Sequence, residues 1–171
     1  PIGEIATRRI TDAASQKDEL GFLKELAKNY SPGDSDMSWT RITLWRSQLA
    51  ALFDNEKNRT VTEIRVLGSK NSPSVRLLAG WLSMQLGVDT KIIHELSGIA
   101  IEGIAGVEIS FDHGELAIIR TGDVASIGQT GSPDSSALLP KRSDQDCLME
   151  DMRFLGEDEV YGAVLRNELT R

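Results

Sequence analysis

The chain has 171 residues, of which 40% are hydrophobic and 26% are charged, with a formal net charge of −7 and a pI of about 4.9. This length fits one domain with a core of its own, and the acidity excludes the basic footprint that nucleic-acid binding requires. Apolar runs are interrupted well before the roughly 20 residues that cross a bilayer. We therefore expect no nucleic-acid partner, no membrane partner and a cytoplasmic location.

The sequence carries few of the side chains that catalyse reactions. It has one cysteine, Cys147, and two histidines, His94 and His113. These residues have no metal-ligand spacing, and one cysteine cannot form an intrachain disulfide. Cys147 stands among apolar neighbours on an expected helix, which predicts a buried, inert thiol. Neither histidine has the neighbours of a catalytic triad, so we expect no catalytic residue, no metal site and no cofactor.

The first 35 residues are expected to form an extended lead-in and one helix. Apolar residues recur at helical spacing over residues 17–30, which predicts the helix. The Ser-Pro-Gly-Asp sequence at 31–34 ends it, because proline cannot continue a helix and glycine permits the turn. The chain begins at Pro1 without a methionine, which suggests a fragment of a longer protein.

A second helix is expected to begin at Asp36 or Ser38, since either side chain can cap free backbone N–H groups. One continuous apolar face follows at helical spacing, made by Ile42, Trp45, Leu49, Leu52 and Phe53. Trp45 lies on this face, so we expect it in the core.

Trp39, Arg41 and Arg46 lie at the edge of that face or off it. Tryptophan and arginine are the side chains most enriched where proteins contact other proteins. We therefore take these three residues as candidate partner-binding residues on the surface. Arg46 can instead pair with an acid or stack on an indole.

Residues 60–67 alternate between apolar and polar side chains and are rich in β-branched residues, which predicts a strand. A turn follows, and a mostly buried helix begins with Ser72 as cap and Pro73 in its first position and ends at Gly87. A strand, a turn of small residues and a helix start can together hold a phosphate. Gly68, Ser69, Lys70 and Ser72 are therefore candidate anion-binding residues, although the loop matches no standard phosphate-binding motif.

The remainder predicts an α/β domain with a mixed sheet of four or five strands, flanked by N-terminal and C-terminal helices, over residues 1–171. Residues 91–96 are expected to pair in parallel with strand 60–67 through a right-handed crossover. Residues 106–111 and 115–120 predict a hairpin, residues 124–128 a short edge strand, and residues 131–136 a loop. Two helices close the chain. The first starts at the cap Ser143 with an apolar stripe, and the second starts near Asp158. The stripe of the first consists of Leu148, Met152 and Leu155.

Several segments resemble a known family. They are SWTRITLWR at 38–46, LAALFD at 49–54, LLAGWL at 77–82, LPKRSDQDCL at 139–148 and DEVY at 158–161. RRITDA at 8–13 and YSPGD at 30–34 look similar to actinobacterial members. In order and spacing these segments resemble the glucose-6-phosphate dehydrogenase assembly protein family, OpcA, over nearly the whole chain.

This resemblance implies a non-catalytic accessory protein. It also implies that the chain is the C-terminal domain of a longer protein, because members of the family have a preceding domain. Members of the family are associated with the assembly or activation of glucose-6-phosphate dehydrogenase, the enzyme that opens the oxidative pentose phosphate pathway and makes NADPH. The expected partner is that dehydrogenase, whereas the sequence leaves self-association open. The alternative is a module that senses a sugar phosphate or a nucleotide with the strand-turn-helix loop at 68–73. The resemblance carries over no catalytic residue.

Overall fold

The computed structural model describes residues 8–53, 59–154 and 156–168. The long strands are β3 (Val61–Gly68), β4 (Thr90–Ile93), β7 (Ile104–Phe111), β8 (Gly114–Thr121), β9 (Val124–Gln129) and β10 (Ser135–Leu138). Two-residue strands form two small ribbons, β1 (Ile10–Thr11) with β2 (Ser35–Asp36) and β5 (Glu95–Leu96) with β6 (Ile99–Ala100). The helices are the 3-10 helix η1 (Ala13–Ser15), α2 (Glu19–Lys28), α3 (Met37–Thr40), α4 (Thr43–Phe53), α5 (Pro73–Leu86), α6 (Asp144–Arg153) and α7 (Glu159–Glu168).

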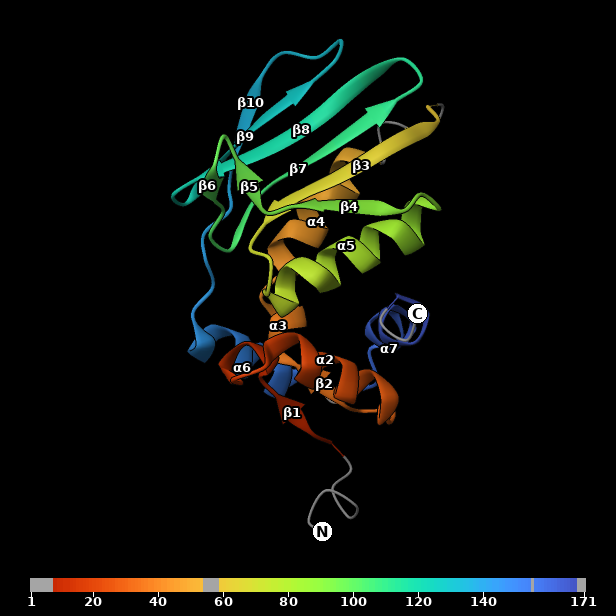
Figure 1. The fold of residues 1–171 in the computed structure, drawn as a ribbon, viewed down its shortest axis with the longest axis vertical. Helices are drawn as coiled ribbons and strands as arrows, with labels where there is room; N and C mark the ends of the chain where they lie inside the picture. Colours follow the sequence, from red (N-terminus) through yellow and green to blue (C-terminus); the bar gives the residue numbers. More distant parts are fainter. Residues whose placement is uncertain (1–7, 54–58, 155, 169–171) are drawn as a thin grey trace.

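The long strands form one mixed sheet in the order β10-β9-β8-β7-β3-β4 (Figure 1). Strands β3 and β4 are parallel and are joined by α5, as predicted, whereas the other neighbours are antiparallel. The mixed α/β class is therefore confirmed. The sheet has six strands in place of the expected four or five, because Ser135–Leu138 pairs with β9 where we expected a loop to end. Strand β9 is consequently an inner strand and not the edge.

Helix α5 is the central element of the fold, as its sequence predicts. Ser72 caps its first turn through a hydrogen bond from the Val75 N–H, and Gly87 ends it in the left-handed conformation with φ of 68°. One side of α5 packs against β3 and β4, and the other side contacts α3 and α7 (Figure 1). Because the helix is covered on both sides, apolar residues occupy most of its circumference.

The core lies between the sheet and the two helices α4 and α5. Alternate residues of the inner strands point to this face, as the two-residue period of a strand dictates. These core residues of the sheet are Ile64, Val66, Val107, Ile109, Leu116, Ile118, Ala125 and Ile127. Trp45 and Leu49 of α4 join the same cluster with 2% and 0% of their surface exposed. The expectation that Trp45 belongs to the core is therefore confirmed.

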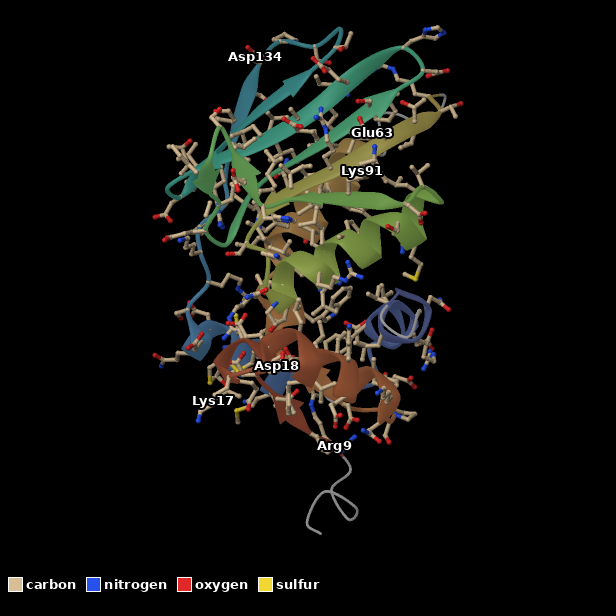
Figure 2. The ribbon with its side chains drawn as sticks, in the orientation of Figure 1. Arg9, Lys17, Asp18, Glu63, Lys91 and Asp134 are labelled. Carbon is tan, nitrogen blue, oxygen red and sulfur yellow. The ribbon has the colours of Figure 1, made fainter. Side chains whose placement is uncertain are left out.

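The opposite face of the sheet carries charged side chains in matching pairs. Lys91 on β4 lies 2.7 Å from Glu63 on β3 (Figure 2). Arg65 on β3 lies 3.2 Å from Glu108 on β7. Such half-exposed pairs stabilise the fold only weakly. They indicate a face of the sheet that is solvated, in contrast to the apolar face under α4 and α5.

The predicted second helix is in fact two helices. Asp36 caps α3 through the Ser38 N–H, as expected, but the helix stops at Thr40 and α4 begins at Thr43. The expected first helix is confirmed as α2, with Asp18 as its cap. Of the expected extended lead-in, residues 1–7 lie outside the described residues.

The predicted apolar stripe of α6 does not face the core. Leu148 and Met152 are 40% and 57% exposed, while Cys147 and Asp151, which lie about 100° around the helix from them, are buried. Leu155, the third residue of that stripe, lies outside the described residues. Hydrogen bonds attach α6 to the body of the protein, with Thr40 donating to Asp151 at 2.9 Å. The stripe prediction was wrong because the side of α6 that carries Cys147 and Asp151 docks on the protein.

Candidate functional site

Trp39 lies inside the protein. Only 3% of its surface is exposed, so the expectation of a surface position was wrong. Its indole N–H donates to the Asp158 carboxylate at 2.7 Å, and its ring packs 5.6 Å from the ring of Tyr161 on α7. Trp39 is therefore covered by the start of α7, which lies more than one hundred residues later in the chain.

Arg46 stacks on Trp39, which was one of the alternatives that the sequence left open. Its guanidinium carbon lies 3.8 Å from the centre of the indole ring, a distance typical of a cation–π contact. Burial lowers the pKa of this guanidinium, and the nearby Asp158 acts in the opposite direction. The charge of Arg46 is therefore engaged in an internal stack, although part of its side chain reaches a pocket.

Arg41 is held by two carboxylates. Its two terminal nitrogens contact both oxygens of Asp12 at 2.7 and 3.0 Å, and one of them also contacts Asp144 of α6 at 2.7 Å. The hydrogen bonds to Asp12 are the main reason that the pKa of Arg41 is raised. A bidentate pair of this kind fixes orientation as well as charge. Arg41 thus links the segment before η1 to the start of α6.

A polar pocket of about 190 Å³ opens beside the Trp39–Arg46 stack. Arg8 and Arg46 line it, and each has at least one buried nitrogen with no hydrogen-bond partner among the described residues. Ser35 and Asp151 also line it, and their side chains interact with each other. Burial is the main cause that raises the pKa of the Asp151 carboxyl, and the hydrogen bond from Thr40 opposes this effect. A hydrogen-bond acceptor that enters from outside would provide a partner for the Arg8 and Arg46 nitrogens.

The loop at 68–72 makes hydrogen bonds to the backbone of residues 101–103. The Ser69 N–H donates to the Gly103 carbonyl at 2.8 Å and its hydroxyl donates to the Ile101 carbonyl at 3.1 Å. A Cβ on Gly68 would lie 2.5 Å from a methyl group of Val75. Gly68 is therefore required by the close packing of β3 against α5. Anion binding by Gly68, Ser69, Lys70 and Ser72 stays a prediction.

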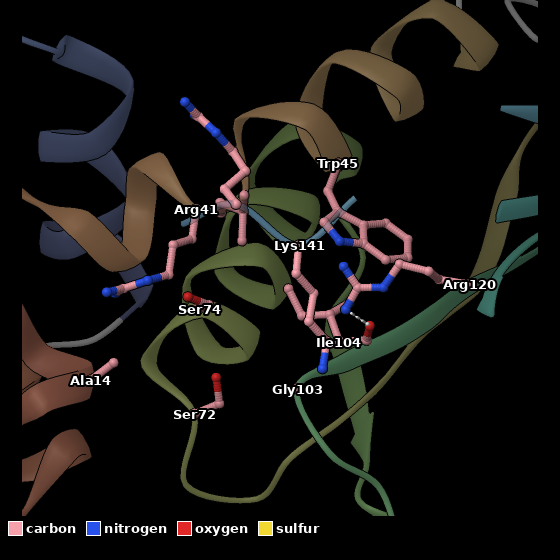
Figure 3. A pocket seen from close by; sticks show the side chains of 11 residues that line it. Ala14, Arg41, Trp45, Ser72, Ser74, Gly103, Ile104, Arg120 and Lys141 are labelled. Atoms are coloured by element: carbon pink, nitrogen blue, oxygen red, sulfur yellow. Dashed lines mark hydrogen bonds between the residues drawn. The ribbon is translucent and has the colours of Figure 1, made fainter. Parts of the chain in front are cut away.

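The four loop residues do not share one pocket. Ser72 lines a pocket of about 240 Å³ together with Arg41, Arg120, Lys141 and Arg142 (Figure 3). Figure 3 places Arg120 beside Trp45, whereas Arg41 points away toward the side on which Ala14 lies. Burial lowers the pKa of Arg120, whose guanidinium donates to the Ile104 carbonyl at 2.6 Å.

Lys70 lies in a different groove, of about 290 Å³, which Lys24, Arg76 and His94 also line. The sequence did not predict that Lys24, Arg76 and His94 lie beside Lys70, because these residues come from three other parts of the fold. The order strand, helix, strand could have indicated this grouping, because the carboxyl ends of parallel strands meet at one edge of a sheet and bring their loops together.

Sequence reasoning also missed an exposed apolar surface on α6. Leu148, Met149, Met152 and the following Phe154 have between 40% and 63% of their surface exposed. We call these four residues the α6 apolar face. The sequence did show the stripe, but it gave no means of telling that a different side of α6 makes the buried contacts.

The remaining reactive side chains are dispersed. Cys147 is buried, as predicted, and burial raises the pKa of its thiol. His94 and His113 are both exposed. In the parts of the chain that the structure describes, no three His, Cys, Asp or Glu residues gather as metal ligands. No helix there is long and apolar enough to cross a membrane.

A comparison with known families identifies the chain. The family model that matches describes the C-terminal domain of a glucose-6-phosphate dehydrogenase subunit, and it covers residues 32–165, more than three quarters of the sequence. The chain belongs to this family. The matched range includes the Trp39–Arg46 stack, the α6 apolar face and most of the residues that line the two basic pockets. No curated protein and no solved structure matches the chain.

Proposed function

We propose that this chain is a non-catalytic accessory protein that binds glucose-6-phosphate dehydrogenase and promotes its assembly or activation. The observation that carries the proposal is the family match over residues 32–165, whose description names a subunit of this dehydrogenase. Through that enzyme the chain would act on the oxidative pentose phosphate pathway and on NADPH supply. A partner that binds the active form more tightly than the inactive form shifts the equilibrium by its difference in affinity.

The α6 apolar face is the contact surface that we propose. Isolated apolar side chains are common on protein surfaces, whereas four exposed ones between residues 148 and 154 favour an interaction site. Phe154 of this face also lines the polar pocket beside Trp39. The dehydrogenase would place apolar side chains against the α6 apolar face and a polar group in the pocket. Specific interfaces commonly have such an apolar centre together with directed hydrogen bonds.

The three candidate partner-binding residues take different parts in this proposal. Arg46 lines the polar pocket and offers its unpartnered Nε to an acceptor. Trp39 holds Arg46 in place from inside the protein. Arg41 fixes the start of α6 through Asp144. Only Arg46 would touch the partner, and the other two would position the surface.

A pair of matched variants tests the contact surface. Met152→Glu places a charge on the α6 apolar face, and Leu138→Glu places one on β10, where Leu138 is 79% exposed. Affinity for the dehydrogenase should fall about tenfold or more in Met152→Glu, since central apolar contacts dominate interface energies. Leu138→Glu should bind as the unaltered chain does. Equal affinities for the two variants, measured by titration calorimetry, would remove α6 from the interface.

A further inference from the structure

The groove around Lys70 has an unusual charge. Four elements converge on it: α2 supplies Lys24, the β3–α5 loop Lys70, the first turn of α5 Arg76, and the residue after β4 His94. Among the described residues, no acidic side chain lines the groove. The chain as a whole has 26 acidic and 19 basic residues, so this concentration runs against its overall balance.

The cations of this groove have no acidic partner in the part of the chain that the structure describes. Within the described residues, Lys24, Lys70 and Arg76 make no salt bridge and no side-chain hydrogen bond, and all three are exposed. Like charges that gather without acids repel one another and create a positive potential at the groove. No described side chain neutralises this charge, so the groove is suited to an anion from outside.

The second basic pocket provides a comparison. There Arg41 is neutralised by Asp12 and Asp144, and Arg142 lies 2.7 Å from Glu150. Arg120 is occupied by the Ile104 carbonyl, and its guanidinium lies 5.5 Å from the Trp45 ring. Of the basic residues in that pocket, only Lys141 is without a partner in the described chain. The groove around Lys70 therefore has more positive charge that no acid neutralises.

We propose that this groove binds a small phosphate monoester through Lys24, Lys70 and Arg76. Lysine offers a compact charge and arginine a planar fork of donors, and both suit phosphate oxygens. Leu20, Leu23 and Ile92 form an apolar lining for the carbon skeleton. The volume of about 290 Å³ lies just below the range of about 300 to 1,000 Å³ that is typical of ligand sites. A ligand of sugar-phosphate size fits this volume better than a dinucleotide.

The position of the groove supports a ligand site. It lies at the carboxyl end of the parallel strands β3 and β4, beside the start of α5. Ligands of open α/β sheets commonly bind at such ends. The Ser69 N–H is already bonded to the Gly103 carbonyl, so it is not one of the binding groups. The site rests on side chains, and it does not depend on the proposed dehydrogenase partner.

Thermal unfolding and titration calorimetry of the full chain test the proposal. The probes are glucose 6-phosphate and inorganic phosphate, at ionic strength held constant with sodium chloride. Glucose 6-phosphate should raise the melting temperature of the unaltered chain, as any ligand that binds only the folded state does. The double variant Lys70→Gln/Arg76→Gln should lose about tenfold or more in affinity, because two charge-assisted contacts disappear.

Two further variants decide the location. Lys141→Gln removes the unpartnered charge of the second basic pocket, and Lys28→Gln removes an exposed charge at the end of α2, outside both pockets. Both should keep the affinity of the unaltered chain. A loss in Lys141→Gln with none in the double variant would overturn the assignment. So would equal affinities in all variants, or no binding of either probe to the unaltered chain.

Discussion

The Trp39 indole contacts three neighbours at once. It donates to Asp158, carries the Arg46 guanidinium on its face and packs against Tyr161. Asp158 in turn accepts from the Tyr161 N–H at the start of α7. The stack of Arg46 on an indole could be anticipated from sequence, because the two residue types stand close together on an expected helix. The burial of Trp39 could not, since it depends on α7, which lies far along the chain and is invisible to local periodicity.

Replacing Trp39 by phenylalanine tests this arrangement. The variant loses the hydrogen bond to Asp158 and weakens the Arg46 stack, so the free energy of unfolding should fall by about 2–4 kcal/mol. Trp81→Phe is the control, because Trp81 is 8% exposed and its indole makes no hydrogen bond in the described chain. Urea unfolding would refute the role of Asp158 if both variants lost the same free energy.

Asp151 should make the folded protein less stable as the pH rises. Burial raises the pKa of its carboxyl in the folded protein, so the folded state binds a proton more readily than the unfolded state, in which aspartate has a pKa of about 3.9. Stability is therefore lost as the pH rises from below that value through the raised folded pKa. Arg8 favours the charged form and Glu150 disfavours it, but burial has the largest effect.

The variant Asp151→Asn removes this titration and keeps an oxygen for the Thr40 hydroxyl. Its stability relative to the unaltered chain should increase between about pH 4 and about pH 7, because only the carboxylate is destabilised by burial. Urea unfolding at both pH values measures the difference. A constant difference would mean that Asp151 titrates as it does in the unfolded chain.

The β3–α5 junction and the α6 helix illustrate what sequence patterns can predict about elements. The junction follows from local rules, since Ser72, Pro73 and Gly87 set the start and the end of α5 in the way those residue types do elsewhere. Helix α6 was predicted with its cap, but its orientation was wrong. Periodicity reveals an apolar stripe and cannot reveal whether that stripe meets the core or a partner.

Gly68→Ala tests whether Gly68 is required by packing. The added methyl group would lie 2.5 Å from Val75 and 2.9 Å from the Gly103 carbonyl oxygen, which belongs to the backbone. The free energy of unfolding should fall by about 1–3 kcal/mol. Gly128→Ala in β9 is the control, since its nearest neighbour atom lies at 3.7 Å. An equal effect of the two substitutions in thermal unfolding would argue against close packing at Gly68.

Across the chain, the sheet and its crossover helix were predictable because they rest on local alternation and turn chemistry. Strand β10 was not predicted, because Ser135 and Ser136 are polar and lack the pattern of a strand. They pair with β9, whose edge is otherwise open. The groove around Lys70 also escaped, because its residues meet only after α2, α5 and β4 have packed. The family was visible in the sequence, since it depends on ordered motifs and not on spatial proximity.

The interaction with glucose-6-phosphate dehydrogenase is the claim on which the proposed function rests. The direct measurement mixes the purified chain with the dehydrogenase of the same organism and records both gel-filtration mobility and dehydrogenase turnover. We expect a complex that elutes ahead of either protein, together with higher turnover or a larger dehydrogenase oligomer. Separate elution at micromolar concentrations with unchanged turnover and oligomeric state would contradict the proposed function.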